Sequence, residues 1–229
     1  MKLKKIAVAC GAALLGASSL AQAEFSANVG ATSNYLWRGV SQTGDDAAIS
    51  GGVDYGHESG FYAGTWISNI DWGIGSGAEV DFYGGFANEV GDFGYDVGAI
   101  YYYYPDSDYD GSDFSELYLN GSWKWFSGGI AYTLWGDADK NAPFSDGDLY
   151  YHLSGSFDVA ETWSIGVTGG YYDFDASKST YGDVDYGHIQ GDLTKSAGDW
   201  GDFTLTVSKA EEESGDDDTK FLIAWSKSF

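Results

Sequence analysis

Apolar and polar residues alternate along most of the chain with a period of two. Between residues 25 and 38 the odd positions are mainly apolar and the even positions mainly polar, and residues 93–104 and 149–158 repeat this pattern. Successive side chains of a β-strand point to opposite faces, so each segment predicts a strand with one apolar and one polar face. Strands of roughly ten residues with this character are typical of barrels that cross a membrane.

Twelve segments carry the pattern, and no stretch after residue 23 has the roughly twenty consecutive apolar residues of a membrane-spanning helix. The sequence therefore predicts an all-β fold, a closed antiparallel up-and-down transmembrane β-barrel of twelve strands. Neighbouring counts of ten or fourteen strands fit the same pattern. The expected strands are residues 25–39, 47–56, 61–68, 79–88, 93–104, 114–121, 126–135, 149–157, 163–172, 186–194, 203–209 and 220–229.

The connections between these segments fall into two alternating groups. Those after the odd-numbered segments are mostly long and acidic, with a net charge of −19, whereas those after the even-numbered segments are mostly short and carry −5. Long outer loops and short periplasmic turns alternate in this way in outer-membrane barrels. An even number of strands then places both termini in the periplasm.

The first 23 residues have the features of a secretory signal peptide. Three lysines precede an apolar stretch over 6–20, and Ala21-Gln22-Ala23 fits the small-x-small rule for cleavage. The predicted mature protein is residues 24–229, a single outer-membrane barrel. A lipoprotein leader ending at Cys10 is the alternative, but only four uncharged residues separate Cys10 from Lys5.

Charge and aromatic content narrow the functional class. Without the three leader lysines, 8 of the 11 basic residues remain against 35 acidic ones, so the mature chain carries −27. This charge excludes binding to nucleic acid through a basic patch. All 9 Trp, 18 Tyr and 13 Phe follow residue 23, and girdles of aromatic rings are normal in membrane barrels.

Several charged residues are predicted to face the lumen, because a charge on the lipid face would be costly. Arg38, the one arginine of the sequence, lies on the polar face near the outer end of the first predicted strand. We expect it to oppose Glu79, Asp81 or Asp96 across a constriction and to set a transverse field for solutes. A structural ion pair that fills a narrow lumen is the alternative. The acidic residues on the polar faces are Asp54, Glu79, Asp81, Asp96, Glu116 and Asp192.

Six tyrosines also fall on polar faces by position. They predict either a stacking surface for sugars and other flat solutes or simple packing of the lumen. They are Tyr83, Tyr102, Tyr118, Tyr150, Tyr172 and Tyr186.

One acidic loop copies the first half of a calcium-binding loop. Asp106, Asp108 and Asp110 supply oxygen ligands at positions 1, 3 and 5, and Gly111 takes position 6. The acid required at position 12 is absent, because Leu117 stands there. A weak calcium site shared with neighbouring loops is one interpretation, and a solvated acidic loop is the other. No other cofactor is predicted.

Two histidines raise the alternative of an outer-membrane hydrolase. The His152-x-Ser154 pair resembles that of the outer-membrane phospholipase, but its position turns both side chains toward the lumen, away from lipid. His188 lies near Asp185 and Asp192 in the sequence, but within a strand and without a convergent acidic pair. We therefore expect no enzymatic activity.

The segments SNYLWRGVSQ at 33–42, GFYAGTWISN at 60–69 and EVDFYGG at 79–85 resemble the opening of the TorF-type porin family. The resemblance is dense over 33–105 and looser beyond, and its motifs are structural. It implies a single outer-membrane barrel of the porin type and transfers no catalytic residue or substrate.

The combined expectation is a channel for passive diffusion of small hydrophilic solutes, with a preference for cations, in the Gram-negative outer membrane. A structural or surface-interaction barrel with a closed lumen is the main alternative. The expected partners are outer-membrane lipids, lipopolysaccharide, the barrel-assembly machinery and small solutes.

The C-terminus carries a predicted assembly signal. Phe221, Ile223, Trp225 and Phe229 share the apolar face of the last predicted strand, and Phe229 ends the chain. This pattern resembles the C-terminal signal by which bacterial outer-membrane proteins are assembled.

We expect deletion of Phe229, or replacement of Trp225 and Phe229 by Asp, to block insertion into the outer membrane. Charges on the lipid face of the last strand oppose its entry into the bilayer. The measurement is the amount of heat-modifiable barrel in outer-membrane fractions, and a normal amount contradicts the prediction.

Overall fold

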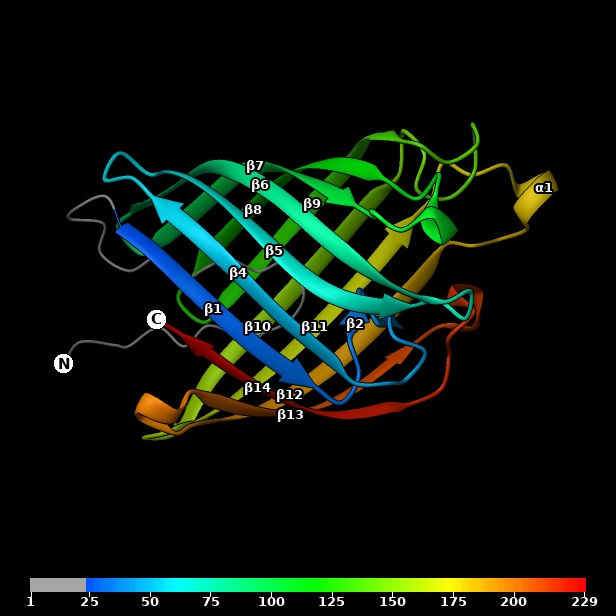
Figure 1. Cartoon of the computed structure of the whole chain (residues 1–229). Helices are drawn as coiled ribbons and strands as arrows, with labels where there is room; N and C mark the ends of the chain where they lie inside the picture. The colour runs from blue at the N-terminus through cyan, green and yellow to red at the C-terminus, as the bar shows by residue number, and fades with distance from the viewer. Residues whose placement is uncertain (1–23) are drawn as a thin grey trace.

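The computed structural model describes residues 24–229, and the predicted signal peptide lies outside the described residues. Within this range twelve strands form one closed barrel, whose antiparallel strands tilt around a common axis (Figure 1). β1 (Glu24–Thr32) closes the barrel by pairing with β14 (Lys220–Ser228) on one side and β4 (Ala48–Gly56) on the other. The predicted twelve-stranded antiparallel barrel is confirmed.

The other barrel strands follow in chain order, and each pairs with its neighbours in the sequence. They are β5 (Phe61–Asp71), β6 (Ser76–Val90), β7 (Phe93–Tyr103), β8 (Phe114–Trp123), β9 (Phe126–Gly136), β10 (Leu149–Ala160), β11 (Trp163–Asp173), β12 (Tyr186–Ser196) and β13 (Asp202–Ala210). The helical turns η1 (Ser107–Tyr109), α1 (Lys178–Tyr181), η2 (Gly198–Trp200) and η3 (Glu212–Ser214) lie in the connections. None of the helices within 24–229 has the length and apolar character needed to span a membrane.

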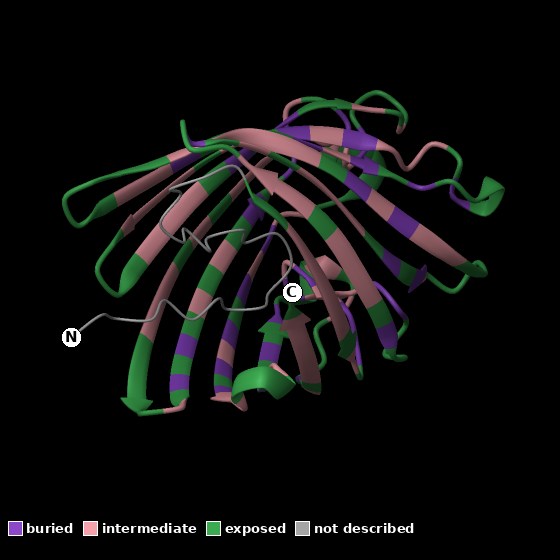
Figure 2. Cartoon of the chain, turned by 60° about the vertical axis from the view of Figure 1, so that its left-hand side comes forward, coloured by how far each residue is buried: buried purple, intermediate pink, exposed green. Residues whose placement is uncertain are grey.

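The outer surface of the barrel is apolar. Every second residue of a strand points outward, as Ile49 and Val53 do on β4 and Leu117 and Leu119 do on β8, and these side chains are exposed. Exposed and more buried bands alternate along the strands in Figure 2. A bilayer stabilises such a surface because it removes apolar side chains from water.

The two ends of the barrel differ. The short turns lie at the end that holds the start of β1 and the C-terminus, and the long acidic loops lie at the opposite end (Figure 1). Aromatic rings pack against each other near the short turns, with ring centroids 4.9 Å apart for Phe25 and Tyr55 and 5.1 Å apart for Phe61 and Phe86. Such rings form the interfacial girdle of membrane barrels.

The first predicted strand, 25–39, is too long. β1 ends at Thr32, and the chain then leaves the wall and turns into the barrel. There it forms a small separate sheet of β2 (Leu36–Trp37) and β3 (Val40–Ser41). We call residues 33–43 the inner hairpin.

The two kinds of connection generate a topology prediction. Epitopes or protease sites placed at 108–111 or 214–218 should be reachable in intact cells, whereas sites at Glu58 or Glu161 should not. Surface labelling of intact and permeabilised cells measures this difference. The reverse pattern would mean that the barrel is inserted the other way round.

Candidate functional site

The inner hairpin places Arg38 inside the barrel. Arg38 and Gly39 connect β2 to β3 and have φ angles of 50° and 87°. Two successive positive φ values are typical of the two-residue type I′ turn. Gly39 is required for a second reason, because a Cβ atom there would lie 2.6 Å from the Cβ atom of His188.

Polar contacts hold the inner hairpin at the mouth of the barrel. Asn34 donates a side-chain hydrogen bond to Asp45 (2.7 Å) and accepts one from the Ser41 hydroxyl (2.7 Å). The backbone N–H of Ser41 donates to the carboxylate of Asp216 (2.8 Å). Lys220 pairs with both Asp45 (2.8 Å) and Asp216 (2.6 Å), so the first and last outer loops are tied to each other beside the hairpin.

Arg38 makes a buried, bidentate ion pair with Glu116 of β8. Its two terminal nitrogens lie 2.8 and 2.6 Å from the two carboxylate oxygens, and the side chains are only 9% and 2% exposed. The sequence predicted Glu79, Asp81 or Asp96 as the carboxylate opposite Arg38, and this prediction is wrong. Glu116 also accepts a hydrogen bond from the Tyr102 hydroxyl (3.3 Å).

Three aromatic rings surround the Arg38 guanidinium. Its central carbon lies 4.2 Å from the ring centroid of Trp37, 4.1 Å from that of Tyr150 and 4.8 Å from that of Tyr172. Cation–π attraction is strongest where water is excluded, as it is here. The charge is therefore balanced both by a carboxylate and by ring faces.

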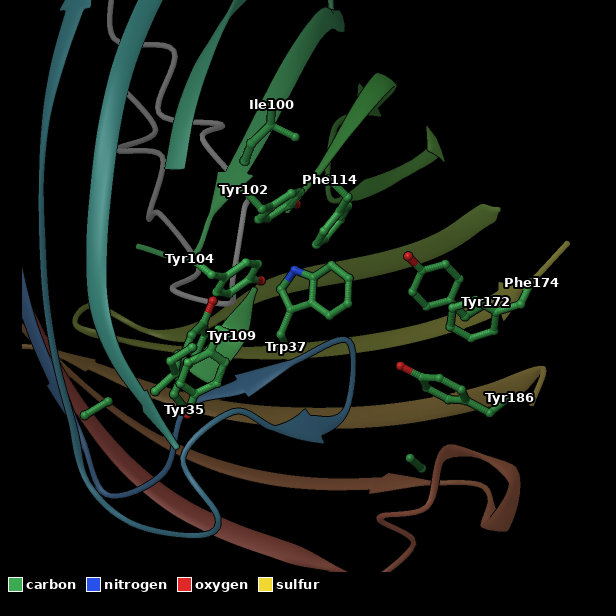
Figure 3. Packing of buried hydrophobic residues seen from close by; sticks show 13 residues of the cluster. Tyr35, Trp37, Ile100, Tyr102, Tyr104, Tyr109, Phe114, Tyr172, Phe174 and Tyr186 are labelled. Atoms are coloured by element: carbon green, nitrogen blue, oxygen red, sulfur yellow. The ribbon is translucent and has the colours of Figure 1, made fainter. Parts of the chain in front are cut away.

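A layer of aromatic rings lies around the inner hairpin, in the half of the lumen toward the long loops. Trp37 lies between Tyr102 and Phe114 on one wall and Tyr172 on the other, with each ring centroid 5.8 or 5.9 Å away (Figure 3). The loop before β10 adds Phe144, whose ring centroid is also 5.9 Å from that of Trp37. These rings pack the lumen, which favours the packing interpretation of the predicted tyrosines Tyr102 and Tyr172 over a stacking surface.

Asp148 fixes the loop that carries Phe144. Its carboxylate accepts hydrogen bonds from the backbone N–H groups of Phe144 (2.7 Å) and Asp175 (2.8 Å). Burial raises the pKa of the Asp148 carboxyl to about 6. Mildly acidic conditions therefore protonate it.

Glu79 and Asp81 on β6 are buried in the same half of the lumen, toward the long loops, but their surroundings differ. Glu79 accepts hydrogen bonds from the hydroxyls of Tyr35 (2.6 Å) and Tyr104 (2.7 Å). Asp81 is 6% exposed, and within the described residues its Oδ1 atom has no hydrogen-bond partner. Asp81 pairs in register with Trp66 and Tyr102 on the neighbouring strands.

The half of the lumen toward the short turns is more open and is lined by tyrosine–carboxylate pairs. Tyr83 donates to Asp54 (2.5 Å), and Tyr62 donates to Asp96 (2.7 Å) while its hydroxyl also contacts that of Tyr118. Of these five residues only Asp96 is fully buried.

Glycines make room for these tyrosines. Gly64, Gly85 and Gly98 stand directly opposite Tyr83, Tyr62 and Tyr118 in the strand registers. A Cβ atom at any of the three glycines would collide with the facing tyrosine ring or hydroxyl. The glycine-rich strands thus let aromatic rings lie flat against a narrow wall.

The loop of Asp106, Asp108 and Asp110 shows no arrangement of calcium ligands. Residues 107–109 form η1, and the Asp106 carboxylate accepts the backbone N–H of Ala78 (2.9 Å). Within 24–229 no group of three His, Cys, Asp or Glu side chains is placed to hold a metal ion. The calcium site stays a prediction without geometric support.

The two histidines of the hydrolase alternative have other partners. His152 lies 3.3 Å from the amide oxygen of Asn120, and Ser154 bonds to the hydroxyl of Thr168 (2.9 Å). His188 bonds to the Tyr150 hydroxyl (2.8 Å). These contacts pair His152 with an amide and Ser154 with a threonine, rather than with each other as nucleophile and base.

The fold is a closed twelve-stranded antiparallel barrel with polar and aromatic side chains in its lumen, which is the architecture of outer-membrane porins. The chain belongs to a family of bacterial proteins of unknown function designated Gcw_chp, whose model matches residues 16–222. No curated protein matches the sequence. The narrower likeness to TorF-type porins stays a prediction.

Solved structures of porins share the architecture at low sequence identity. KdgM porin is 11% identical, with a TM-score of 0.59 over 89% of this chain and 99% of that chain. A second KdgM structure, in complex with disordered oligogalacturonate, is 9% identical, with a TM-score of 0.59 over 90% and 99%. NanC porin is 13% identical, with a TM-score of 0.54 over 89% and 98%. At these identities the likeness concerns the fold.

The Arg38–Glu116 pair generates a stability prediction. Arg38→Ala and Glu116→Ala should each lower the free energy of unfolding by about 3 kcal/mol, because each leaves a buried charge without its partner. The double variant should lose clearly less than the sum of the two. Urea unfolding of the detergent-solubilised barrel measures these changes.

The control for this comparison of single and double variants is the pair of Lys178 and Asp183, whose side chains are both 63% exposed. Their replacement by Ala should change stability little, because solvent screens the pair. Strictly additive losses for Arg38 and Glu116 would show that the two side chains do not stabilise each other.

Proposed function

We propose that this protein is an outer-membrane channel for passive diffusion of small hydrophilic solutes and that it prefers cations. The observation that carries the proposal is the charge of the lumen wall. Six carboxylates of the barrel strands point inward, against the guanidinium of Arg38 and, at the mouth, the ammonium of Lys220, which Asp45 and Asp216 already pair. The six are Asp54, Glu79, Asp81, Asp96, Glu116 and Asp192. In this proposal both termini are periplasmic, and the acidic loops face the cell exterior beside lipopolysaccharide.

The position of the charges supports cation preference. Loop carboxylates lie in water, where salt screens them beyond about 10 Å at 0.1 M ionic strength. Lumen carboxylates act on a passing ion at short range and in a lower dielectric, so their field persists at higher salt. The KdgM neighbour was solved with oligogalacturonate, a polyanion. The acidic lumen of this chain would repel such a ligand.

The aromatic layer around Trp37 supports a channel that is closed at its outer half in this conformation. In this proposal conduction requires the inner hairpin to move, because Trp37 and Tyr172 are 7% and 0% exposed and their ring centroids lie 5.9 Å apart. A permanently closed, structural barrel is the second candidate, and the same layer is the observation that favours it.

The preference for cations can be measured as a reversal potential across a salt gradient in a planar bilayer. K⁺ should be favoured over Cl⁻, and more strongly at low salt. Replacing Glu79 and Asp81 by Gln and Asn should reduce that preference more than neutralising the loop residues 211–213, which serve as the matched control. Anion preference would contradict the proposal, and the absence of any conductance would support the structural barrel.

A further inference from the structure

The barrel wall contributes most of the contacts that surround the Arg38 guanidinium. Four groups surround Arg38. Three belong to the wall: Glu116 to β8, Tyr150 to β10 and Tyr172 to β11. The fourth, Trp37, belongs to the inner hairpin itself. If the inner hairpin withdrew, Trp37 would leave with it, but the carboxylate and two ring faces would remain. We call these three wall residues the guanidinium site.

The guanidinium site holds more polar groups than Arg38 uses. Tyr172 is 0% exposed, and within the described residues its hydroxyl has no hydrogen-bond partner. Thr133, also 0% exposed and directly opposite Glu116 in the register of β8 and β9, has an unpartnered hydroxyl as well. Buried polar groups are normally hydrogen-bonded, so unpartnered ones beside an ion pair point to a ligand with additional donors or acceptors.

The group that occupies the site is carried on a short turn rather than on the wall. β2 and β3 pair through only two registered residue pairs, Leu36 with Ser41 and Trp37 with Val40. Arg38 also adopts a positive φ of 50°, which is unfavourable for a residue with a side chain. The barrel strands, in contrast, pair along most of their length on both sides. The wall residues of the site are thus held independently of the hairpin, so the site would stay in place if the hairpin moved.

We propose that the guanidinium site recognises the guanidinium group of a small polar solute, and that Arg38 is its tethered internal occupant, which such a solute displaces. This proposal rests on the proposed channel function, because it names the class of solute that the lumen selects. A planar guanidinium fits the carboxylate with two parallel hydrogen bonds and stacks on both tyrosine rings, which an ammonium group does not do equally well.

The first experiment vacates the site and offers it a free ligand. In Arg38→Ala, millimolar methylguanidinium chloride should raise the unfolding temperature by about 3 °C relative to NaCl at equal ionic strength, because the ligand binds only the folded barrel. Methylammonium chloride should raise it less. Lys178→Ala, which removes a positive charge from an exposed loop, is the matched control and should not respond. A response of the control equal to that of Arg38→Ala, or no response of Arg38→Ala, would overturn the proposal.

The second experiment tests displacement with Arg38 in place, and it needs no conductance. The predicted mature chain has no cysteine, so Val40→Cys introduces a single thiol on the half-buried β3 strand of the inner hairpin. Methylguanidinium should accelerate maleimide labelling of this thiol several-fold, whereas NaCl should not. Lys178→Cys should be labelled at a constant rate. Adding Glu116→Gln should abolish the acceleration.

A rise in the unfolding temperature of Arg38→Ala with methylguanidinium, but no accelerated labelling at position 40, would mean that solutes do not displace Arg38. This result would overturn the proposal. If Arg38→Ala does not fold, Arg38→Lys replaces it in the first experiment. An unfolding temperature of Arg38→Lys that methylguanidinium does not raise above its value in NaCl would then count against the site. A barrel that binds methylguanidinium but carries no current would refute the channel function alone, because both experiments measure binding rather than conduction.

Discussion

A polypeptide backbone surrounded by hydrocarbon has no water to bond, so each N–H and C=O group must find a partner within the chain. The closed ring of strands meets this demand when β14 returns to pair with β1. Closure then imposes the other features of the molecule. Most outward side chains are apolar and suit contact with lipid, whereas carboxylates such as Glu79, Asp96 and Glu116 are turned into a narrow lumen.

The lumen stabilises these charged side chains in more than one way. Tyrosine hydroxyls donate to Glu79, Asp54 and Asp96, and the glycines opposite several of these tyrosines give their rings room to lie against the wall. Glu116 is neutralised by a full positive charge, which the chain brings from its first outer connection. Removing Arg38 would leave the buried Glu116 carboxylate without its charged partner, which is strongly destabilising. The position of the inner hairpin therefore depends on the charge of a strand far away in the sequence.

The molecule thus combines a continuous barrel wall with the small inner hairpin, and different interactions hold the two parts. The wall is held by long ladders of backbone hydrogen bonds, whereas the inner hairpin is held by one ion pair, ring contacts and polar contacts at the mouth. Porins of similar architecture share the wall. The hairpin with Arg38 at its tip lies inside the lumen among the rings of Tyr102, Phe114 and Tyr172, and in the proposed channel opening depends on it, whereas selectivity depends on the carboxylates of the wall.

The period-two pattern by itself determined the antiparallel barrel fold, the apolar and polar side of each strand, and the contrast between long acidic loops and short turns, and it left ten, twelve or fourteen strands open until the structure showed twelve. These features are local, because adjacent residues of a strand must point to opposite faces. The same pattern placed Arg38, Glu79, Asp81, Asp96 and Glu116 on the polar side. It could not choose among the carboxylates, since all of them face the same lumen.

Only the tertiary structure decided that the chain leaves the wall after Thr32. Alternation continues through Tyr35 and Trp37, and the Arg38-Gly39 turn lacks the Asn-Gly or Asp-Gly pair that marks a tight hairpin in a sequence. A longer β1 and an inward hairpin are therefore indistinguishable locally. The hairpin is selected by burial of Trp37 among rings of β7, β8 and β11 and by a carboxylate 78 positions away in the sequence, and these groups come together only when the barrel closes.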